Sequence, residues 1–337
     1  METDGLRWRL TGAPGELFPD VAPPRRELRE VEYLHVRARR IINRVPEASR
    51  LPFRYTINAY RGCTHACTYC FARPTHEYLG MGIGEDFERR IVVKVNAAER
   101  LRAELAAPSW SGETIAMGTN TDPYQQCEGR YRLTRRIIET LSAARNPFSI
   151  LTKSTMILRD TDLLAAAAER TWVHTALSIG TLDDDVWRLT EPGTPPPRRR
   201  LDAVARLNEA GIGCDVLMAP VLPGFSDSPE QLRATAAACL DAGARSVTPI
   251  VLHLRRGVRD HYLGWLAEAR PDLLDRYEEL YPRAYAPGDV QRRVAETVRA
   301  VVEERGPARR NPRAAREGGP PSPPPVAEAP PQLRLLP

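Results

Sequence analysis

Three cysteines lie close together in one short stretch of the chain and are the residues best suited to do chemistry. Cys63, Cys67 and Cys70 have the spacing Cys-x3-Cys-x2-Cys. Three thiolates on one loop can bind three irons of a [4Fe–4S] cube. Because no fourth cysteine follows within reach, one iron would stay open to a ligand that is not a protein side chain. The spacing therefore predicts an iron–sulfur cluster with one open coordination position.

Other roles for cysteine fit this sequence less well. A structural zinc site needs further ligands at closed spacing, whereas Cys127, Cys214 and Cys239 are scattered singly. Disulfides are disfavoured because we find no signal peptide and the chain far exceeds the size of a small stapled domain. His65 lies inside the segment, but the thiolates already suffice, so we expect it beside the cluster or exposed. We expect a reducing, cytoplasmic compartment and no apolar run that spans a membrane.

The cysteine segment must be positioned by the elements around it, which alternate between two patterns. Short β-branched or aromatic runs predict strands at residues 55–59, 114–118, 148–152, 172–179, 213–219 and 246–252. Helical patterns separate them at residues 97–106, 134–144, 160–168, 198–210 and 229–242, with an N-cap at Asp160 and C-caps at Gly211 and Gly243. This alternation predicts an α/β fold with a parallel sheet, an open, partial (β/α)6 barrel. Further helices at 260–268, 271–281 and 289–304 should pack outside or across it.

Functional residues of such barrels gather at the carboxyl ends of the strands. The residues at these positions are mostly polar: the cysteine segment after the first strand, residues 118–124 after the second, Lys153 and Ser154 after the third, Ser178 at the fourth, residues 220–224 after the fifth, and His253 and Arg255 after the sixth. We therefore expect polar side chains from six different strands to face one mouth.

The cysteine segment, with Tyr69 directly before its last cysteine, resembles that of the radical S-adenosylmethionine (SAM) enzymes. Over about residues 40–285 the chain is similar to their branch related to spore photoproduct lyase, and in particular to an actinobacterial group within it. The resemblance implies a [4Fe–4S] cluster and SAM as cofactors, reductive cleavage of SAM to a 5′-deoxyadenosyl radical, and hydrogen abstraction from an unknown substrate. It also implies a flavodoxin- or ferredoxin-type electron donor.

The resemblance further implies which residues contact SAM. Thr121 and Asp122 would accept hydrogen bonds from its amino group, Lys153 and Ser178 would lie near its carboxylate and ribose, and Tyr69 would lean on the adenine. Glu191 and Arg200 could instead pair with each other. The full implied set is Tyr69, Gly118, Thr119, Asn120, Thr121, Asp122, Lys153, Ser178, Glu191 and Arg200. No residue is assigned to the hydrogen-transfer step.

Three classes of function are compatible with these features. The first is a radical SAM enzyme of lyase or oxidoreductase type. The second is an iron–sulfur protein that senses redox state without turnover. The third is a nucleic-acid repair or modification enzyme, although the lyase delivers hydrogen from a cysteine at the position where this chain has Thr119.

Charge gives little support to a nucleic-acid substrate. The formal net charge is +5, but residues 305–337 hold six arginines against two glutamates, a net +4, which leaves about +1 on the rest of the chain. The same region is rich in proline and predicts disorder. We expect an N-terminal arm at 1–45, the barrel at 46–256, a helical extension at 257–305 and a disordered tail at 306–337.

Overall fold

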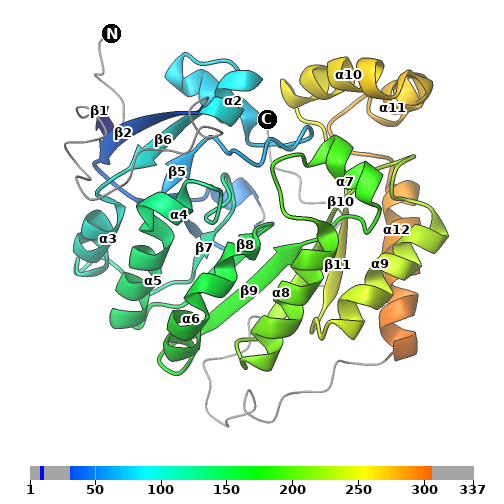
Figure 1. The fold of residues 1–337 in the computed structure, drawn as a ribbon. Helices are drawn as coiled ribbons and strands as arrows, with labels where there is room; N and C mark the ends of the chain where they lie inside the picture. The colour runs from blue at the N-terminus through cyan, green and yellow to red at the C-terminus, as the bar shows by residue number, and fades with distance from the viewer. Residues whose placement is uncertain (1–7, 11–30, 50, 306–337) are drawn as a thin grey trace.

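A seven-stranded sheet forms the centre of the computed structural model, which describes residues 8–10, 31–49 and 51–305 (Figure 1). Six neighbouring strands are parallel and follow one another in chain order. They are β4 (Tyr55–Ile57), β7 (Ile115–Met117), β8 (Phe148–Thr152), β9 (Val173–Ser178), β10 (Cys214–Val221) and β11 (Val247–Val251). An additional strand, β3 (Ile42–Arg44), pairs antiparallel with β4. The predicted α/β fold of the partial-barrel type is confirmed, and the described strands form no closed barrel.

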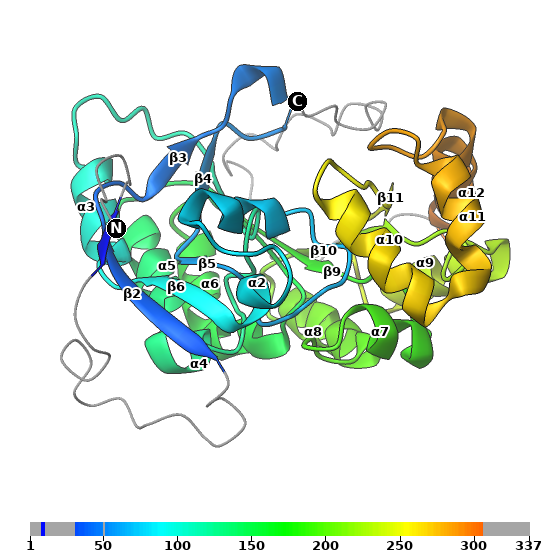
Figure 2. The same cartoon turned by 90° about the horizontal axis from the view of Figure 1, so that it is seen from above.

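Helices follow most of these strands and line the outer face of the sheet (Figures 1 and 2). The longer ones match the predicted segments: α3 (Ala97–Leu105), α5 (Leu133–Ala143), α6 (Thr161–Ala168), α8 (Pro197–Glu209) and α9 (Pro229–Asp241). Shorter helices lie in the connections: η2 (Glu47–Ser49), η3 (Arg73–Leu79), α2 (Glu85–Arg89), α4 (Glu128–Tyr131), η4 (Thr155–Asp160) and α7 (Asp184–Thr190). Right-handed crossovers of this kind bring the carboxyl ends of all the parallel strands to one end of the sheet.

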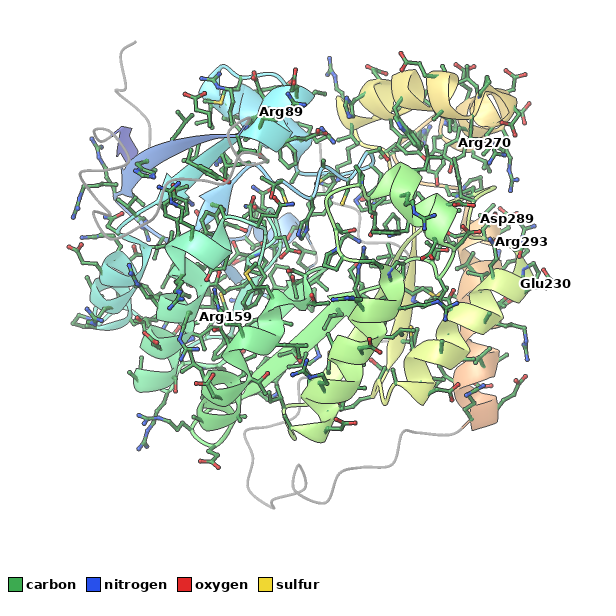
Figure 3. The ribbon with its side chains drawn as sticks, viewed as in Figure 1. Arg89, Arg159, Glu230, Arg270, Asp289 and Arg293 are labelled. Carbon is green, nitrogen blue, oxygen red and sulfur yellow. The ribbon has the colours of Figure 1, made fainter. Side chains whose placement is uncertain are left out.

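The structure bears out the two predicted glycine caps and differs at the predicted aspartate cap. Gly211 and Gly243 directly follow the last turns of α8 and α9 with φ of 77° and 84°, as predicted. Asp160 occupies the N-cap position of α6, but its side chain makes no capping hydrogen bond. Its carboxylate instead pairs with the guanidinium groups of Arg135 (2.9 Å) and Arg159 (2.8 Å), because two cations attract a buried carboxylate more strongly than neutral backbone N–H groups do. Arg159 is labelled in Figure 3.

A second sheet of four strands was not predicted from the sequence. Its order is β1 (Trp8–Leu10), β2 (Glu32–Ala38), β6 (Arg90–Lys94) and β5 (Tyr60–Arg61). β2 pairs parallel with β6, and β5 leads directly into the cysteine segment. Part of the region expected to be an arm is therefore paired in sheets. The domain boundaries stay a prediction, and the tail at 306–337 lies outside the described residues.

The C-terminal helices are α10 (Val258–Ala269), α11 (Leu274–Leu280), which a short turn η5 (Pro271–Leu273) precedes, and α12 (Gly288–Arg305). α12 packs on β11 and α9 through a stripe of buried valines at helical spacing: Val290, Val294, Val298 and Val301. Arg89 at the end of α2 and Arg270 at the end of α10 lie on opposite sides of the end of the sheet where the parallel strands finish (Figure 3). None of the described helices is long and apolar enough to cross a bilayer.

Gly118 permits the close approach of the loop after β7 to β8. Its φ is +87°, and a Cβ atom added there would lie 1.8 Å from the carbonyl oxygen of Leu151. We expect Gly118→Ala to lower the free energy of unfolding by about 2–4 kcal/mol, because both the φ angle and the backbone contact would have to change. Urea denaturation followed by circular dichroism measures this loss.

Gly264→Ala is the matched control for this prediction. Gly264 is exposed within α10 and has open space around its Cα atom, so the same substitution should stabilise the protein by about 0.5–1 kcal/mol. Equal unfolding free energies for the two variants would contradict the role given to Gly118.

Candidate functional site

The loop that carries the three cysteines lies between β5 and η3 and has no helix or strand of its own. Turn hydrogen bonds satisfy some of its backbone groups, such as those from the Ala66 N–H to the Cys63 carbonyl oxygen (3.3 Å) and from the Cys70 N–H to the Cys67 carbonyl oxygen (3.3 Å). Other groups find partners elsewhere in the protein. The Cys63 N–H donates to the carbonyl oxygen of Phe87 (2.9 Å), and the Thr68 N–H donates to the carbonyl oxygen of Thr190 (3.0 Å). The loop is thus attached on one side to α2 and on the other to the end of α7.

Two residues from the loop after β7 fix the start of the cysteine loop. Gln125 is fully buried; its Nε2 donates to the carbonyl oxygen of Gly62 (3.0 Å), and its Oε1 accepts from the Thr64 N–H (3.1 Å). The Thr121 hydroxyl donates to the same Gly62 oxygen (2.7 Å) and accepts from Gln125 Nε2 (2.9 Å). These contacts hold the backbone on both sides of Cys63.

Arg73 fixes the middle of the loop through its guanidinium group. The side chain is 1% exposed, and its Nε and Nη2 donate to the carbonyl oxygen of Cys67 at 3.2 and 2.9 Å. The same guanidinium pairs with Glu88 (2.5 Å), which compensates the buried charge. Arg73 therefore couples the position of Cys67 to α2.

Gly193 allows the connection after α7 to lie directly on the cysteine loop. Its N–H donates to the carbonyl oxygen of His65 (3.0 Å), and a Cβ atom added there would lie 2.1 Å from the carbonyl oxygen of Thr64. Only glycine fits at this contact. The proline-rich connection at 192–197 therefore lies directly on the cysteine loop and forms one side of the site.

Asp122 forms the centre of a buried group beside Cys63. Its carboxylate accepts from the Thr152 hydroxyl (2.6 Å), the Tyr124 N–H (2.9 Å) and the Lys153 N–H (2.8 Å), and His65 Nδ1 lies 3.4 Å from it. Burial alone would raise the pKa of Asp122, but His65 and these donors lower it below its usual value. Burial would likewise lower the pKa of His65, yet Asp122 and Cys63 raise it to about 10.

Glu191 forms the centre of a second group, next to the first. One carboxylate oxygen accepts from the Lys153 ammonium (3.0 Å) and from the Tyr69 hydroxyl, and the other accepts from Arg200 Nη2 (2.5 Å). The Lys153 ammonium also donates to the Ser178 hydroxyl (2.7 Å) and to the carbonyl oxygen of Ala219 (3.2 Å). Side chains from the ends of β8, β9 and α7 and from the start of α8 are thus joined through one carboxylate.

The charge balance of this group keeps Glu191 ionised. Burial by itself raises the pKa of Glu191, but Arg200 and Lys153 outweigh it and hold this pKa well below the ordinary value. Arg200 is 1% exposed and also donates to the carbonyl oxygens of Ser178 (3.0 Å) and Pro195 (2.8 Å). The predicted alternative that Glu191 and Arg200 pair with each other is confirmed; their contact with a cofactor stays a prediction.

The residues implied to contact SAM therefore fall into two sets. Tyr69, Lys153, Ser178, Glu191 and Arg200 meet in one network, as described. In the loop after β7, the oxygen atoms of Thr121 and Asp122 are already used by protein partners, whereas the side chains of Thr119 and Asn120 make no hydrogen bond to any residue in the described ranges and are partly exposed. Thr119 and Asn120 are the members of this loop whose side chains are free to bind a ligand.

Sequence reasoning missed the residues that hold the cysteine loop. The side chains of Gln125 and Arg73 bind backbone groups of the loop. Contacts of this kind leave no pattern of spacing in the sequence. His65 was expected beside the cluster or exposed; it is 3% exposed. Cys127, Cys214 and Cys239 are buried, and burial raises the pKa of each thiol, to about 12 for Cys214 and Cys239.

The donor set of the loop suits an iron–sulfur cluster. The three thiols are free of disulfides, Cys63 and Cys67 are buried, and Cys70 is partly exposed. Burial raises the pKa of Cys67 well above its usual value and that of Cys70 to about 11, so binding of iron must displace protons from them. No three His, Cys, Asp or Glu side chains in the described ranges converge as they would around a single ion. A cube does not need such convergence, because each thiolate binds a different iron.

Comparisons with known proteins agree with this chemistry. The family model described as Radical SAM superfamily matches residues 57–236. An uncharacterized protein of Mycobacterium tuberculosis is 47% identical over 273 residues, which cover 81% of this chain and 80% of that protein. An uncharacterized protein of Methanocaldococcus jannaschii is 30% identical over 200 residues, 59% of this chain and 71% of that protein.

Among solved structures, the fold is similar to that of spore photoproduct lyase in complex with a dinucleoside spore photoproduct. The TM-score is 0.54 and the sequence identity 19%, over 77% of this chain and 76% of that one. At this identity the similarity concerns the fold.

The Glu191 group yields a stability prediction. Glu191→Gln leaves two largely buried cations, Arg200 and Lys153, without their carboxylate, so we expect the free energy of unfolding at pH 7 to fall by about 3–5 kcal/mol. Because the folded-state pKa is depressed, the contribution of Glu191 is present above the unfolded-state value of 4.5 and is lost as pH falls below it. The difference between wild type and variant should therefore shrink on acidification.

Glu304→Gln is the matched control, because its ion pair with Arg233 is exposed on both sides. We expect almost no change in the free energy of unfolding, because solvent screens an exposed ion pair. Denaturant titrations from pH 7 down to about pH 2 measure both variants and cover the range below 4.5 in which the contribution of Glu191 is lost. A Glu191→Gln effect as small as the control, or one that grows toward low pH, contradicts the charge balance described above.

Proposed function

We propose, from the premise that this chain belongs to the radical SAM superfamily, that it is an enzyme which binds a [4Fe–4S] cluster and SAM and abstracts a hydrogen atom from an organic substrate. The observation that carries the proposal is the position of the Lys153–Glu191–Arg200 network. It lies against the cysteine loop at the carboxyl ends of the strands, with Tyr69 of that loop bound to Glu191. A protein that only stored a cluster would need the three cysteines but not this buried set of charges.

Cys63, Cys67 and Cys70 would hold the cluster, and Thr119 and Asn120 would contact SAM beside the network that contains Lys153. When bound together, cluster and SAM supply a 5′-deoxyadenosyl radical by reductive cleavage of the sulfonium. The chain's own residues orient and shield this chemistry. Gln125, Thr121 and Arg73 fix the backbone of the cysteine loop, and the 192–197 connection covers it against water.

The charges around the site also favour these cofactors. Lys153 and Arg200 carry two positive charges around the single carboxylate of Glu191, and the His65 imidazole lies beside the carboxylate of Asp122. A surplus of positive charge next to the cysteine loop stabilises thiolates that carry iron and attracts the carboxylate of SAM. A flavodoxin- or ferredoxin-type donor of the electron remains part of the proposal.

The iron and sulfide content of the protein can be measured directly. Protein reconstituted under anaerobic conditions should bind about four iron and four sulfide per chain, and it should release 5′-deoxyadenosine from SAM when dithionite is added. Alanine at Cys63, Cys67 or Cys70 should remove the iron, because each thiolate binds one iron of the cube. Iron analysis and chromatography of the nucleoside products measure the two quantities.

Cys214→Ala and Cys239→Ala are the controls, since both thiols are buried away from the loop. They should retain the iron. Stoichiometric zinc with no iron uptake would end the proposal, and iron uptake without release of 5′-deoxyadenosine would favour a redox protein that does not turn over.

Asn120 provides a test of SAM binding apart from the cluster. Its side chain has no hydrogen-bond partner among the described residues, so Asn120→Ala should weaken SAM binding by about tenfold to a hundredfold while the iron content stays unchanged. Asp122→Ala differs from it and should lower the iron content, because Asp122 holds His65 of the cysteine loop. Equilibrium dialysis with SAM and iron analysis separate the effects; unchanged SAM affinity in the Asn120 variant contradicts this assignment.

A further inference from the structure

Phe71, directly after the last cysteine of the loop, is the start of a group of side chains that the SAM network does not use. Its ring is 41% exposed although it adjoins a cluster ligand. The His253 ring lies 5.8 Å from it, centroid to centroid, and the Arg255 guanidinium lies over it at 6.0 Å. Tyr285 continues the group, with its ring centroid 5.7 Å from that of His253.

Phe71, His253 and Arg255 come from two segments that lie side by side, and Tyr285 comes from a third, between α11 and α12. His253 and Arg255 follow the carboxyl end of β11, and Phe71 leads into η3. A Cβ atom built on Gly257 would lie 3.4 Å from the Pro74 side chain, so the segment that enters α10 lies against the start of η3. The group therefore lies where the last parallel strand of the sheet meets the cysteine loop.

Arg255 is half-buried and differs from the buried arginines Arg73 and Arg200 of this region. The guanidinium groups of Arg73 and Arg200 are fully engaged with carbonyl oxygens and carboxylates. Arg255 has no carboxylate within ion-pair distance among the described residues, and its buried Nε has no hydrogen-bond partner there. A buried N–H group of a cation without an acceptor is costly. Such a group is expected where a ligand supplies the acceptor.

The surroundings of Arg255 supply no substitute for that ligand. Asp260, the acidic residue nearest in sequence, is 85% exposed and pairs with Arg259 at 3.8 Å. Burial, followed by the nearby Arg255, lowers the pKa of His253 to about 4, and the rings of Phe71 and Tyr285 already lie against its imidazole. The group thus offers one cation with free donors and several flat rings beside it.

We propose that Phe71, His253 and Arg255 form the substrate-binding part of the active site and that the substrate carries an anionic group, phosphate or carboxylate, next to a planar ring. Arg255 binds the anion through its planar fork of N–H donors. The exposed Phe71 side chain stacks against the ring, and His253 packs against Phe71 and keeps it in place. The proposal rests on the proposed function, since it places the substrate beside the cysteine loop, but binding can be measured without turnover.

The test is calorimetric titration of the reconstituted full-length protein with two anionic probes and their neutral counterparts. Thymidine monophosphate is compared with thymidine, and benzoate with benzamide. At least one anionic probe should bind saturably and more tightly than its neutral counterpart; which one binds shows whether the anion is phosphate or carboxylate. Arg255→Gln should weaken binding of that probe by about tenfold and leave the neutral counterpart unchanged. Phe71→Leu should weaken both.

Arg256→Gln is the matched control, because the neighbouring arginine is exposed and its replacement removes the same charge. It should leave probe binding unchanged. Arg255→Lys, which keeps the charge but loses the planar fork, should give an intermediate affinity and serves if the glutamine variant fails to fold. Equal losses in the Arg255 and Arg256 variants, or no saturable binding of either anionic probe at millimolar concentration, overturn the proposal. Failure of the proposed function would appear separately, as wild-type protein without iron or without release of 5′-deoxyadenosine.

Discussion

The cysteine loop must be irregular and rigid at once, and most of the surrounding structure satisfies that constraint. A loop that places three thiolates around one cube cannot pair its N–H and C=O groups in a helix or sheet. Turn bonds within the loop satisfy some of these groups, and others need partners elsewhere. The partners come from four directions: Gln125 and Thr121 after β7, Phe87 in α2, Gly193 after α7, and Arg73 from the loop's own end.

The charges follow from the same arrangement. The parallel strands end at one place, so the residues after them are brought close together whether or not their charges attract. Lys153 after β8 and Arg200 in α8 would repel each other if Glu191 did not lie between them. A carboxylate bound by two cations is fixed in position and keeps its charge, since protonation would leave the cations unpaired. The polar end of the sheet is thereby preorganised, and a bound ligand meets side chains that are already oriented.

The sequence predicted the parts of this structure that depend on local pattern. Runs such as Phe148–Thr152 are buried parallel strands flanked by amphipathic helices, and their order along the chain follows from the right-handed crossover. The second sheet was missed, because β6 pairs with β2, which lies more than fifty residues earlier, and no local signal records that pairing. The cysteines were predicted from spacing, whereas Gln125 and Arg73 act through backbone contacts that spacing does not reveal. Asp160 was predicted as a cap from its position, but the arginines that bind it come from α5 and η4.

Lys153 shows why one basic residue cannot replace another at this site. The chain has only two lysines among its 48 basic residues, so arginine is the default cation. At position 153 three acceptors, from Ser178, Ala219 and Glu191, surround the ammonium at 2.7, 3.2 and 3.0 Å. An ammonium has three donors on one compact nitrogen and can reach all three acceptors, whereas a guanidinium spreads its donors over a plane. The planar group suits Arg200, which lies between the carboxylate of Glu191 and two carbonyl oxygens, and Arg255, which has a ring face beneath it. The choice between lysine and arginine thus follows the shape of each acceptor set.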